Sequence, residues 1–93
     1  MSARLSPSLK LGQIVATPNA LAQINQTDIT LALARHVVCD WGDLCAEDKA
    51  VNDQAMVEGM RILSAYQAAN GTKFWIITEA DRSVTTVLLP DDY

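Results

Sequence analysis

Residues 63–78, LSAYQAANGTKFWIIT, contain the feature that decides the fold, which is Asn70-Gly71 between two runs of apolar and aromatic residues. Asn-Gly is the strongest short-range signal of a β-hairpin, because a type I′ turn needs positive φ at both central positions. A two-residue loop here places Tyr66 opposite Trp75, and the loop length sets the register of the whole strand pair. We therefore predict that Tyr66 and Trp75 are cross-strand neighbours.

A period of two continues on both sides of this hairpin and predicts three antiparallel strands, at Met60–Ala69, Thr72–Ala80 and Val84–Pro90. A four-residue loop at 80–83 joins the second strand to the third. Both faces of the middle strand are apolar, so we expect it to be central and at least partly covered on both sides. The predicted ladders are Tyr66, Trp75 and Leu88 on one face, and Ala65, Ile76 and Val87 on the other.

The chain before the hairpin predicts one short strand, at 11–16, followed by helices. The first helix begins at Pro18 with Thr17 as its N-cap, because proline at the first position loses no hydrogen bond. The second begins at Thr27, a further capping residue, and ends near Cys39. Its apolar stripe faces the core and consists of Ile29, Ala32, Leu33, His36 and Val37.

A third helix is predicted at Ala46–Val57, capped by Asp43 and closed by Glu58-Gly59. Its inward residues are expected to be Val51, Ala55 and Met56. The fold class is therefore α+β: a short N-terminal strand, two to three helices, then a C-terminal three-stranded antiparallel meander. Residues 1–10 are predicted to form a flexible tail and residues 11–93 a single domain.

Composition points to the cytoplasm as the expected location. No apolar run is long enough to span a bilayer, and the N-terminus has no continuous apolar segment typical of a signal peptide. We expect no membrane contact. Cys39 and Cys45 are expected to be free thiols, because reductants of the cytosol oppose an isolated disulfide.

The net charge of −4 is unevenly distributed. Residues 1–39 sum to +2, residues 40–58 to −5, and residues 59–93 to −1. An acidic surface repels nucleic-acid phosphates, so direct nucleic-acid binding is disfavoured. The acidic segment instead predicts a protein partner with a basic surface, through Glu47, Asp48 and Asp53. The alternative is a helix face that is merely solvated.

The segment from Arg35 to Asp43 is the richest in groups that carry chemistry. His36 with the carboxylates of Asp40 and Asp43 could perform general acid–base chemistry. His36, Cys39 and Cys45 offer three metal ligands, but their spacing differs from that of structural zinc sites. The alternative is a half-buried histidine satisfied by a loop carbonyl or carboxylate. We expect no metal and no cofactor, and we assign no catalytic residue beyond these candidates.

Two further side chains are candidates for ligand contact. Trp41 can cover the edge of the core with its N–H satisfied in the loop, or it can contribute to binding together with Arg35. Arg82, in the turn at 79–83, can anchor that turn through a buried ion pair or grasp a ligand.

Three stretches resemble a family of small bacterial proteins carried by plasmids, phages and integrated elements: LGQIVATP at 11–18, Arg35-His36 with DWGDL at 40–44, and GTKFWIITEADRSVTTVLLP at 71–90. Its members often carry the name of a type I restriction endonuclease subunit. A chain of 93 residues has no room for a methyltransferase or a nuclease-translocase. The resemblance therefore implies an accessory protein of a mobile genetic element. This chain has Cys39 where the family usually has glycine.

These observations lead to two functional hypotheses. The first is a small accessory binding protein, in the sharpest form an anti-defence inhibitor whose acidic helix binds a basic partner surface. The second is a small enzyme, or a binder of a nucleotide-sized ligand, with a pocket formed by His36, Asp40, Asp43 and Arg82. The second requires the loop at 40–43 to meet the turn at 79–83. The first is favoured, and self-association is left open.

Overall fold

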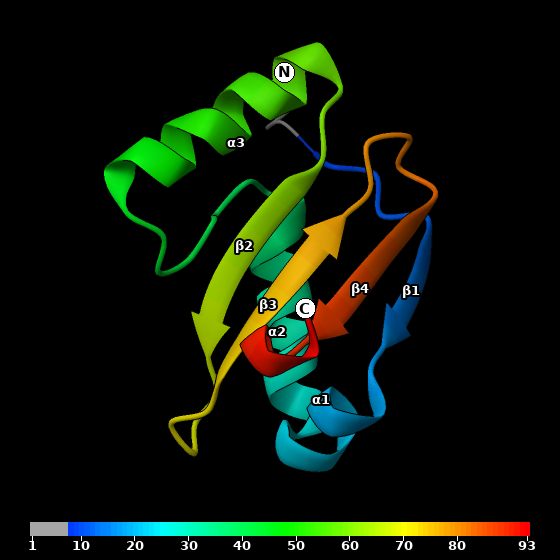
Figure 1. Cartoon of the computed structure of the whole chain (residues 1–93), viewed down its shortest axis with the longest axis vertical. Coiled ribbons are helices and arrows are strands. Elements are labelled where there is room, and N and C mark those ends of the chain that lie inside the picture. Colours follow the sequence, from blue (N-terminus) through cyan, green and yellow to red (C-terminus); the bar gives the residue numbers. More distant parts are fainter. Residues whose placement is uncertain (1–7) are drawn as a thin grey trace, which may run out of the picture.

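Four strands form one mixed sheet in the order β1-β4-β3-β2 (Figure 1). The structure is a computed structural model that describes residues 8–93. β2, β3 and β4 form the predicted antiparallel meander, and β1 pairs in parallel with β4, which confirms the α+β class. The elements are β1 Gln13–Ala16, α1 Pro18–Gln23, α2 Gln26–Val37, α3 Ala46–Glu58, β2 Ile62–Gln67, β3 Lys73–Thr78, β4 Val84–Leu88 and the short 3₁₀ helix η1 Pro90–Asp92.

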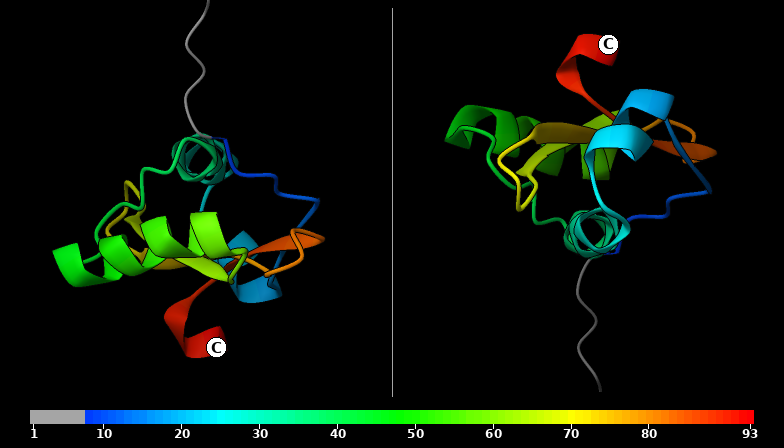
Figure 2. Two further views of the ribbon diagram at one scale, coloured as in Figure 1. Left: turned by 90° about the horizontal axis from the view of Figure 1, so that it is seen from above. Right: turned by 90° about the horizontal axis from the view of Figure 1, so that it is seen from below.

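The two faces of the sheet are covered unequally, as the edge-on views in Figure 2 show. α2 crosses one face, η1 lies on the opposite face, and α3 runs beside β2 at one edge of the sheet. Within residues 8–93, none of the helices has the length and apolarity needed to cross a membrane. The main core lies between α1, α2 and the sheet, and consists of Ala20, Ile24, Ile29, Ala32, Tyr66, Ala68, Phe74, Ile76 and Val87.

A smaller core joins α3 to the rest of the domain and consists of Leu9, Trp41, Ala55 and Ile62. Leu9 is 4% exposed, and its N–H donates to the Val37 carbonyl at 2.9 Å. The ordered domain therefore begins before residue 11, which corrects the predicted boundary. The remainder of the predicted tail, residues 1–7, lies outside the described residues.

The predicted register of the first hairpin is wrong by one residue, whereas that of the second is correct. Trp75 pairs with Leu88 and Ile76 with Val87, as expected. In the first hairpin, however, Tyr66 lies opposite Phe74, and Trp75 lies opposite Ala65. Tyr66 and Trp75 therefore point to opposite faces of the sheet.

The cause is a three-residue loop, 69–71, in place of a two-residue loop. Ala68 N–H donates to the Thr72 carbonyl at 2.8 Å, and Gly71 N–H donates to the Ala68 carbonyl at 2.9 Å. Gly71 has φ 89° and Asn70 is not among the residues with positive φ. This is the pattern of a three-residue loop with a single left-handed glycine, so the same dipeptide serves a different turn. The Asn70 side chain donates to the Gln23 carbonyl at the end of α1.

The helix caps are partly as predicted. Thr17 caps α1, since its hydroxyl oxygen accepts from Ala20 N–H at 3.0 Å. α2 is capped by Asn25, not Thr27, because the Asn25 side chain accepts from Asp28 N–H at 2.8 Å. The expected cap of α3 is also wrong: its N-cap is Cys45, which makes no capping bond with its side chain.

Asp43 does not cap α3, because the segment before α3 runs along the edge of β2 and pairs with it. Asp43 N–H donates to the Ala65 carbonyl at 2.8 Å, and Ala65 N–H donates to the Trp41 carbonyl at 3.2 Å. Gly42 bridges to Ala65 with φ 76°, and a Cβ at this position would lie 1.9 Å from the Ala65 carbonyl oxygen. Only glycine permits this approach. The outer edge of β2 is thereby covered.

α2 ends in a Schellman motif that places a cysteine in the left-handed region. Cys39 has φ 65°. Its N–H donates to the His36 carbonyl at 3.1 Å, and Asp40 N–H donates to the Arg35 carbonyl at 2.9 Å. Glycine is the usual residue here, because a Cβ is disfavoured at positive φ.

We therefore predict that Cys39→Gly is more stable than Cys39→Ala by about 1 kcal/mol in urea unfolding. Both variants remove the partly buried thiol, so their difference isolates the cost of positive φ. Equal stabilities, or a more stable alanine variant, would show that position 39 does not need this conformation.

Candidate functional site

His36 lies on the face of α2 that meets the sheet, and it is fully buried. Its Nδ1 lies 2.5 Å from Ser64 Oγ on β2, and its Nε2 lies 2.8 Å from Thr78 Oγ1 on β3. Thr78 Oγ1 lies 2.7 Å from Thr85 Oγ1 on β4. The Thr85 hydroxyl in turn is 2.7 Å from the Leu11 carbonyl oxygen. We call this run of four hydrogen bonds the buried chain.

The final acceptor sets the direction of three of the four bonds in the buried chain, and the charge state of His36 sets the fourth. The Leu11 carbonyl can only accept, so the Thr85 hydroxyl donates to it and must itself accept from Thr78. Thr78 has then used its proton and accepts from His36 Nε2–H. Burial favours the neutral imidazole, whose single proton is then on Nε2. His36 Nδ1 consequently accepts from the Ser64 hydroxyl.

Burial lowers the pKa of His36 to about 4. A neutral imidazole whose two nitrogens are both engaged, and which no solvent reaches, cannot exchange protons with a substrate. We expected a half-buried histidine held by a loop carbonyl or carboxylate; its partners are instead hydroxyls and its burial is complete. The burial also contradicts the hypothesis that His36 lines a ligand pocket with Asp40, Asp43 and Arg82.

The hydroxyl partners of His36 were not predicted from the sequence. Each of them occupies an inward position of its strand: Ser64 lies between buried Ile62 and Tyr66, and Thr85 lies two residues before buried Val87. Polar residues at inward positions are the signal that could have found them. The predicted register did not reveal this signal, because that register places Ser64 and Thr78 on opposite faces of the sheet.

Arg35 and Asp40 form a surface ion pair that ties the end of α2 to β2. Arg35 Nε and Nη2 lie 2.7 and 3.1 Å from the two carboxylate oxygens of Asp40. The hydrogen bond from Arg35 holds the pKa of Asp40 below its usual range. The guanidinium also lies 5.0 Å from the Tyr66 ring centre, and the Tyr66 hydroxyl donates to the Asp40 carbonyl at 2.7 Å. Arg35 and Asp40 thus contribute to structure.

Trp41 is 3% exposed and therefore is not part of a binding surface. Its ring lies edge-on to His36, with ring centres 5.8 Å apart. Its indole N–H donates to Asp53 Oδ1 on α3 at 2.9 Å. The prediction that Trp41 covers the core is confirmed, but the partner of its N–H lies on α3 and not in the loop. Asp53 therefore holds Trp41 through a hydrogen bond, in addition to contributing negative charge to α3.

Arg82 anchors the second turn, although through carbonyl oxygens and not through an ion pair. Its Nη1 lies 2.7 Å from the Met60 carbonyl oxygen, and its Nη2 lies 3.3 Å from that of Ala55. Ala55 belongs to the last turn of α3, where a positive charge stabilises the helix dipole. Arg82 also has φ 62°. Its guanidinium is therefore committed to holding this turn against the end of α3.

The cysteines show no sign of special chemistry. Both thiols are free, with Cys39 half-buried and Cys45 exposed. Burial raises the pKa of the Cys39 thiol, which makes it a poorer nucleophile. In the part of the chain that the structure describes, no three His, Cys, Asp or Glu side chains gather as a metal site would require.

α3 is attached to the domain by few residues. Ala55 and Asn52 are its buried residues, and the Asn52 side chain pairs with the backbone of Leu63, donating to its carbonyl at 2.7 Å. Val51 was expected to face inward, but it is 65% exposed. The polar Asn52 takes the inward position because it pairs with the edge of β2. Most of the surface of α3 therefore faces solvent.

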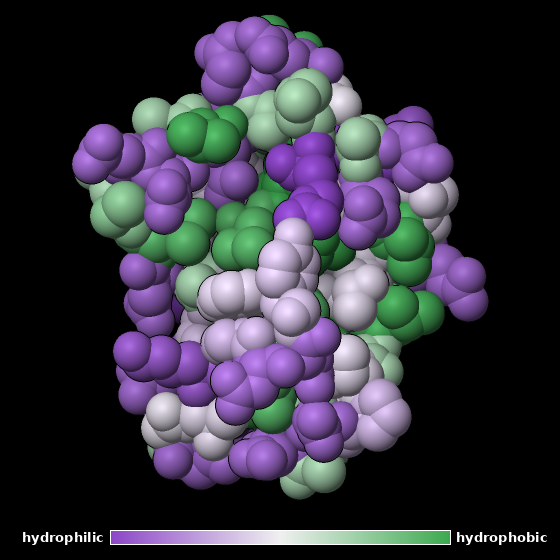
Figure 3. Space-filling model, viewed as in Figure 1, coloured by the Kyte–Doolittle hydropathy of each residue, from purple (hydrophilic) through white to green (hydrophobic). Residues whose placement is uncertain are grey.

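The solvent-facing side of α3 carries exposed acidic residues and one exposed cation, Lys49, but these form no ion pair among residues 8–93. Glu47, Asp48 and Glu58 are exposed. Among residues 8–93, the one ion pair joins Arg35 to Asp40. In the space-filling view, hydrophilic residues gather over α3 and are interrupted by hydrophobic ones (Figure 3). We call this side of α3 the acidic face.

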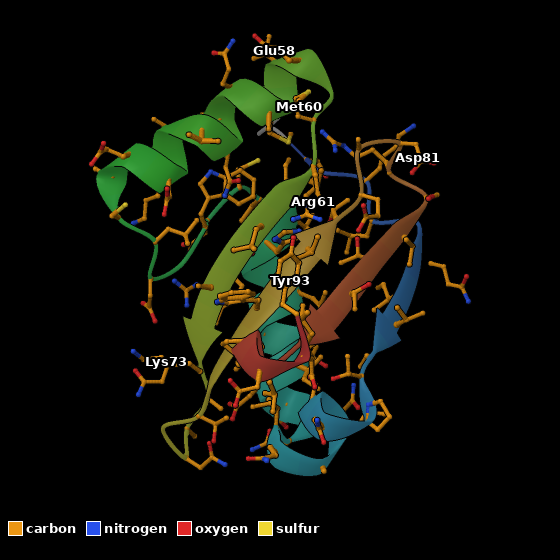
Figure 4. All side chains as sticks on the ribbon, in the orientation of Figure 1. Glu58, Met60, Arg61, Lys73, Asp81 and Tyr93 are labelled. Atoms are coloured by element: carbon orange, nitrogen blue, oxygen red, sulfur yellow. The ribbon has the colours of Figure 1, made fainter. Side chains whose placement is uncertain are left out.

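Two surface hollows lie along α3, with volumes of about 300 and 350 Å³. Val51 and Arg61 line both, with Asp48 at the first and Glu58 at the second. Figure 4 shows Glu58 and Met60 at the end of α3, and Arg61 beside Tyr93 over the open face of the sheet. Tyr93 packs edge-on against Trp75 with ring centres 5.8 Å apart. The acidic face thus borders concave apolar surface.

Comparison with protein-family models, with curated proteins and with solved structures finds no match for this chain. The residues described above are therefore the basis for proposing a function. These residues fall into two groups: a buried polar group that includes His36, and the exposed acidic residues of α3.

We predict that Thr85→Val destabilises the domain by about 2–3 kcal/mol, because it leaves the Thr78 hydroxyl proton without an acceptor and the Leu11 carbonyl without its donor. Thr86→Val, the same change one residue further along β4 on the other face, should shift stability by less than about 0.5 kcal/mol. Chemical unfolding of both variants measures the difference. A small effect at Thr85 would mean that the buried chain contributes little.

We also predict that stability falls on mild acidification because of His36. Its folded pKa of about 4 lies below the unfolded value of about 6.5, so the unfolded state takes up the proton first as the pH falls. The contribution is complete above about pH 6.5 and is lost as the pH falls towards 4. Unfolding free energy should drop by about 2 kcal/mol between about pH 7.5 and about pH 5.

The chain has a single histidine, which makes the control direct. His36→Gln should be less stable at neutral pH but should show little pH dependence in this interval. A wild type with constant stability over the interval would contradict the neutral, buried imidazole.

Proposed function

We propose that the chain is a non-catalytic binding protein that attaches to a basic protein surface through the acidic face of α3. One observation carries this proposal: the acidic side chains of α3 are exposed and form no ion pair among residues 8–93. Complementary charge of this kind accelerates encounter with a partner and selects against wrong ones.

The position of Glu58 supports binding over mere solubility. Glu47 and Asp48 lie in the first turn of α3, where acidic residues favour the helix dipole. Glu58 lies at the opposite end, where a negative charge is unfavourable to the helix dipole, and its carboxylate accepts a hydrogen bond from Gln54. Helix stability therefore does not explain why a glutamate occupies position 58. A basic partner would account for it.

The apolar residues beside the acids supply the second element of an interface. Val51 is 65% exposed and Met60 is 56% exposed, and both line the hollows along α3. Protein interfaces combine apolar anchors with a charged rim. The resemblance to small proteins of mobile elements supports the finer proposal that the partner belongs to a host defence system, which would make this chain an anti-defence inhibitor.

The test is capture of a partner from native host lysate on immobilised protein, with captured proteins identified by mass spectrometry. We expect a basic protein whose capture weakens with added salt, because screening reduces attraction between exposed charges. Asp48→Lys/Glu58→Lys should reduce capture about tenfold or more. Asp53 is left unchanged, since its loss would break the bond to Trp41.

Asp91→Lys combined with Gln23→Lys and Leu31→Lys is the matched control, because it changes net charge equally at exposed positions away from α3. Capture by this control should equal that of the wild type. Equal capture by the α3 variant and the wild type, with both folded by circular dichroism, would refute the role of the acidic face.

A further inference from the structure

The outer edge of β1 carries backbone groups with no partner among residues 8–93. Gln13 N–H donates to the Ser83 carbonyl at 2.9 Å, and Thr17 N–H donates to the Val87 carbonyl at 3.0 Å. Alternate residues of a strand direct their backbone groups to opposite sides. Ile14 and Ala16 therefore direct their N–H and C=O groups away from β4. In Figure 1 no element lies beyond β1 on that side.

The two edges of the sheet differ in whether another segment covers them. The edge of β2 is covered by the segment containing Gly42, which pairs with Ala65. The edge of β1 has no such cover and none of the usual protection by charge, proline or a bulge within the strand. Ile14 is 50% exposed and Val15 is 38% exposed. An edge of this kind is a template for pairing with a further strand.

Charge indicates which strand can pair there. The chain has net charge −4, so two copies repel each other over most of their surface. Residues 11–27, which form β1, α1 and the start of α2, contain no charged residue. This is the region where two copies can approach without like-charge repulsion. Its exposed apolar residues are Ile14, Val15 and Leu21.

The charges that flank β1 favour antiparallel approach. Lys10 is exposed just before the strand. Asp92 lies at the other end, where its carboxylate accepts from the Thr17 hydroxyl at 2.7 Å and from the Asn19 amide at 2.8 Å. Antiparallel pairing of two β1 strands sets the Lys10 end of one copy beside the Asp92 end of the other, so the flanking charges are complementary.

We propose that β1 pairs with β1 of a second copy about a two-fold axis at Val15, which joins the two sheets into one continuous sheet. Ile14 of each copy lies opposite Ala16 of the other, and each such pair exchanges both backbone hydrogen bonds. The interface is separate from the acidic face of α3 and does not depend on the proposed function.

Light scattering coupled to size exclusion, from micromolar to millimolar protein, tests the proposal. We expect the mass to rise with concentration from 10.1 kDa towards twice that value. Ile14→Pro removes only an outward N–H, as proline on an edge strand is tolerated, and Ile14→Lys adds an edge charge. Both should weaken dimerisation about tenfold or more. Leu31→Lys, at a 59% exposed position on α2, is the control and should dimerise normally.

Amide hydrogen exchange identifies the surface directly. The amides of Ile14 and Ala16 should gain protection as concentration rises, whereas that of Val15, which faces β4, should not change. A wild type that stays monomeric throughout would overturn the proposal and leave the edge to a strand of another protein or to solvent. A dimer that survives both Ile14 variants, or is lost in Leu31→Lys, would overturn it as well.

Discussion

The run of hydrogen bonds through His36 is the constraint on which the rest of the structure depends. It starts at Ser64 on β2, passes through the imidazole and two threonine hydroxyls on β3 and β4, and ends at the Leu11 carbonyl. Buried polar groups are costly unless every one is paired. In the part of the chain that the structure describes, no buried side-chain nitrogen or oxygen lacks a partner. One neutral histidine thus sets the position of α2 over three strands.

Local signals predicted most elements of the fold but not the residue contacts between them. The stripe on α2 is confirmed, as Ile29, Ala32 and His36 are all buried. Thr17 and Gly59 were correctly identified as helix ends because capping depends on neighbouring residues only. Asn70-Gly71 identified the hairpin but not its loop length, since the same two residues suit two turn types. Burial of Tyr66 beside Phe74 decides between them, and burial is a tertiary property.

For the candidate site, too, the sequence revealed which side chains could act but not which distant residues they contact. His36, Trp41 and Arg82 were singled out because their side chains can perform chemistry, and all three are used to hold segments together. Their roles depend on distant partners, such as Asp53 for Trp41 and the Met60 carbonyl for Arg82, which sequence spacing does not reveal. The acidic face could be predicted, because exposed charge on a helix is visible in composition alone. The inward position of Asn52 on α3 could not, since it depends on the backbone of Leu63.

The pairing of β1 with β4 joins two segments that lie far apart in the sequence. The Thr85 hydroxyl meets the Leu11 carbonyl 74 residues earlier, and Asp92 binds the Thr17 hydroxyl 75 residues earlier. Contacts of such sequence separation form late, because a long loop must close first. During synthesis, β1 waits without its partner strand until β4 has left the ribosome, while α1 and α2 can already form. The apolar strand is exposed throughout that interval, and the sheet is completed only when β4 emerges.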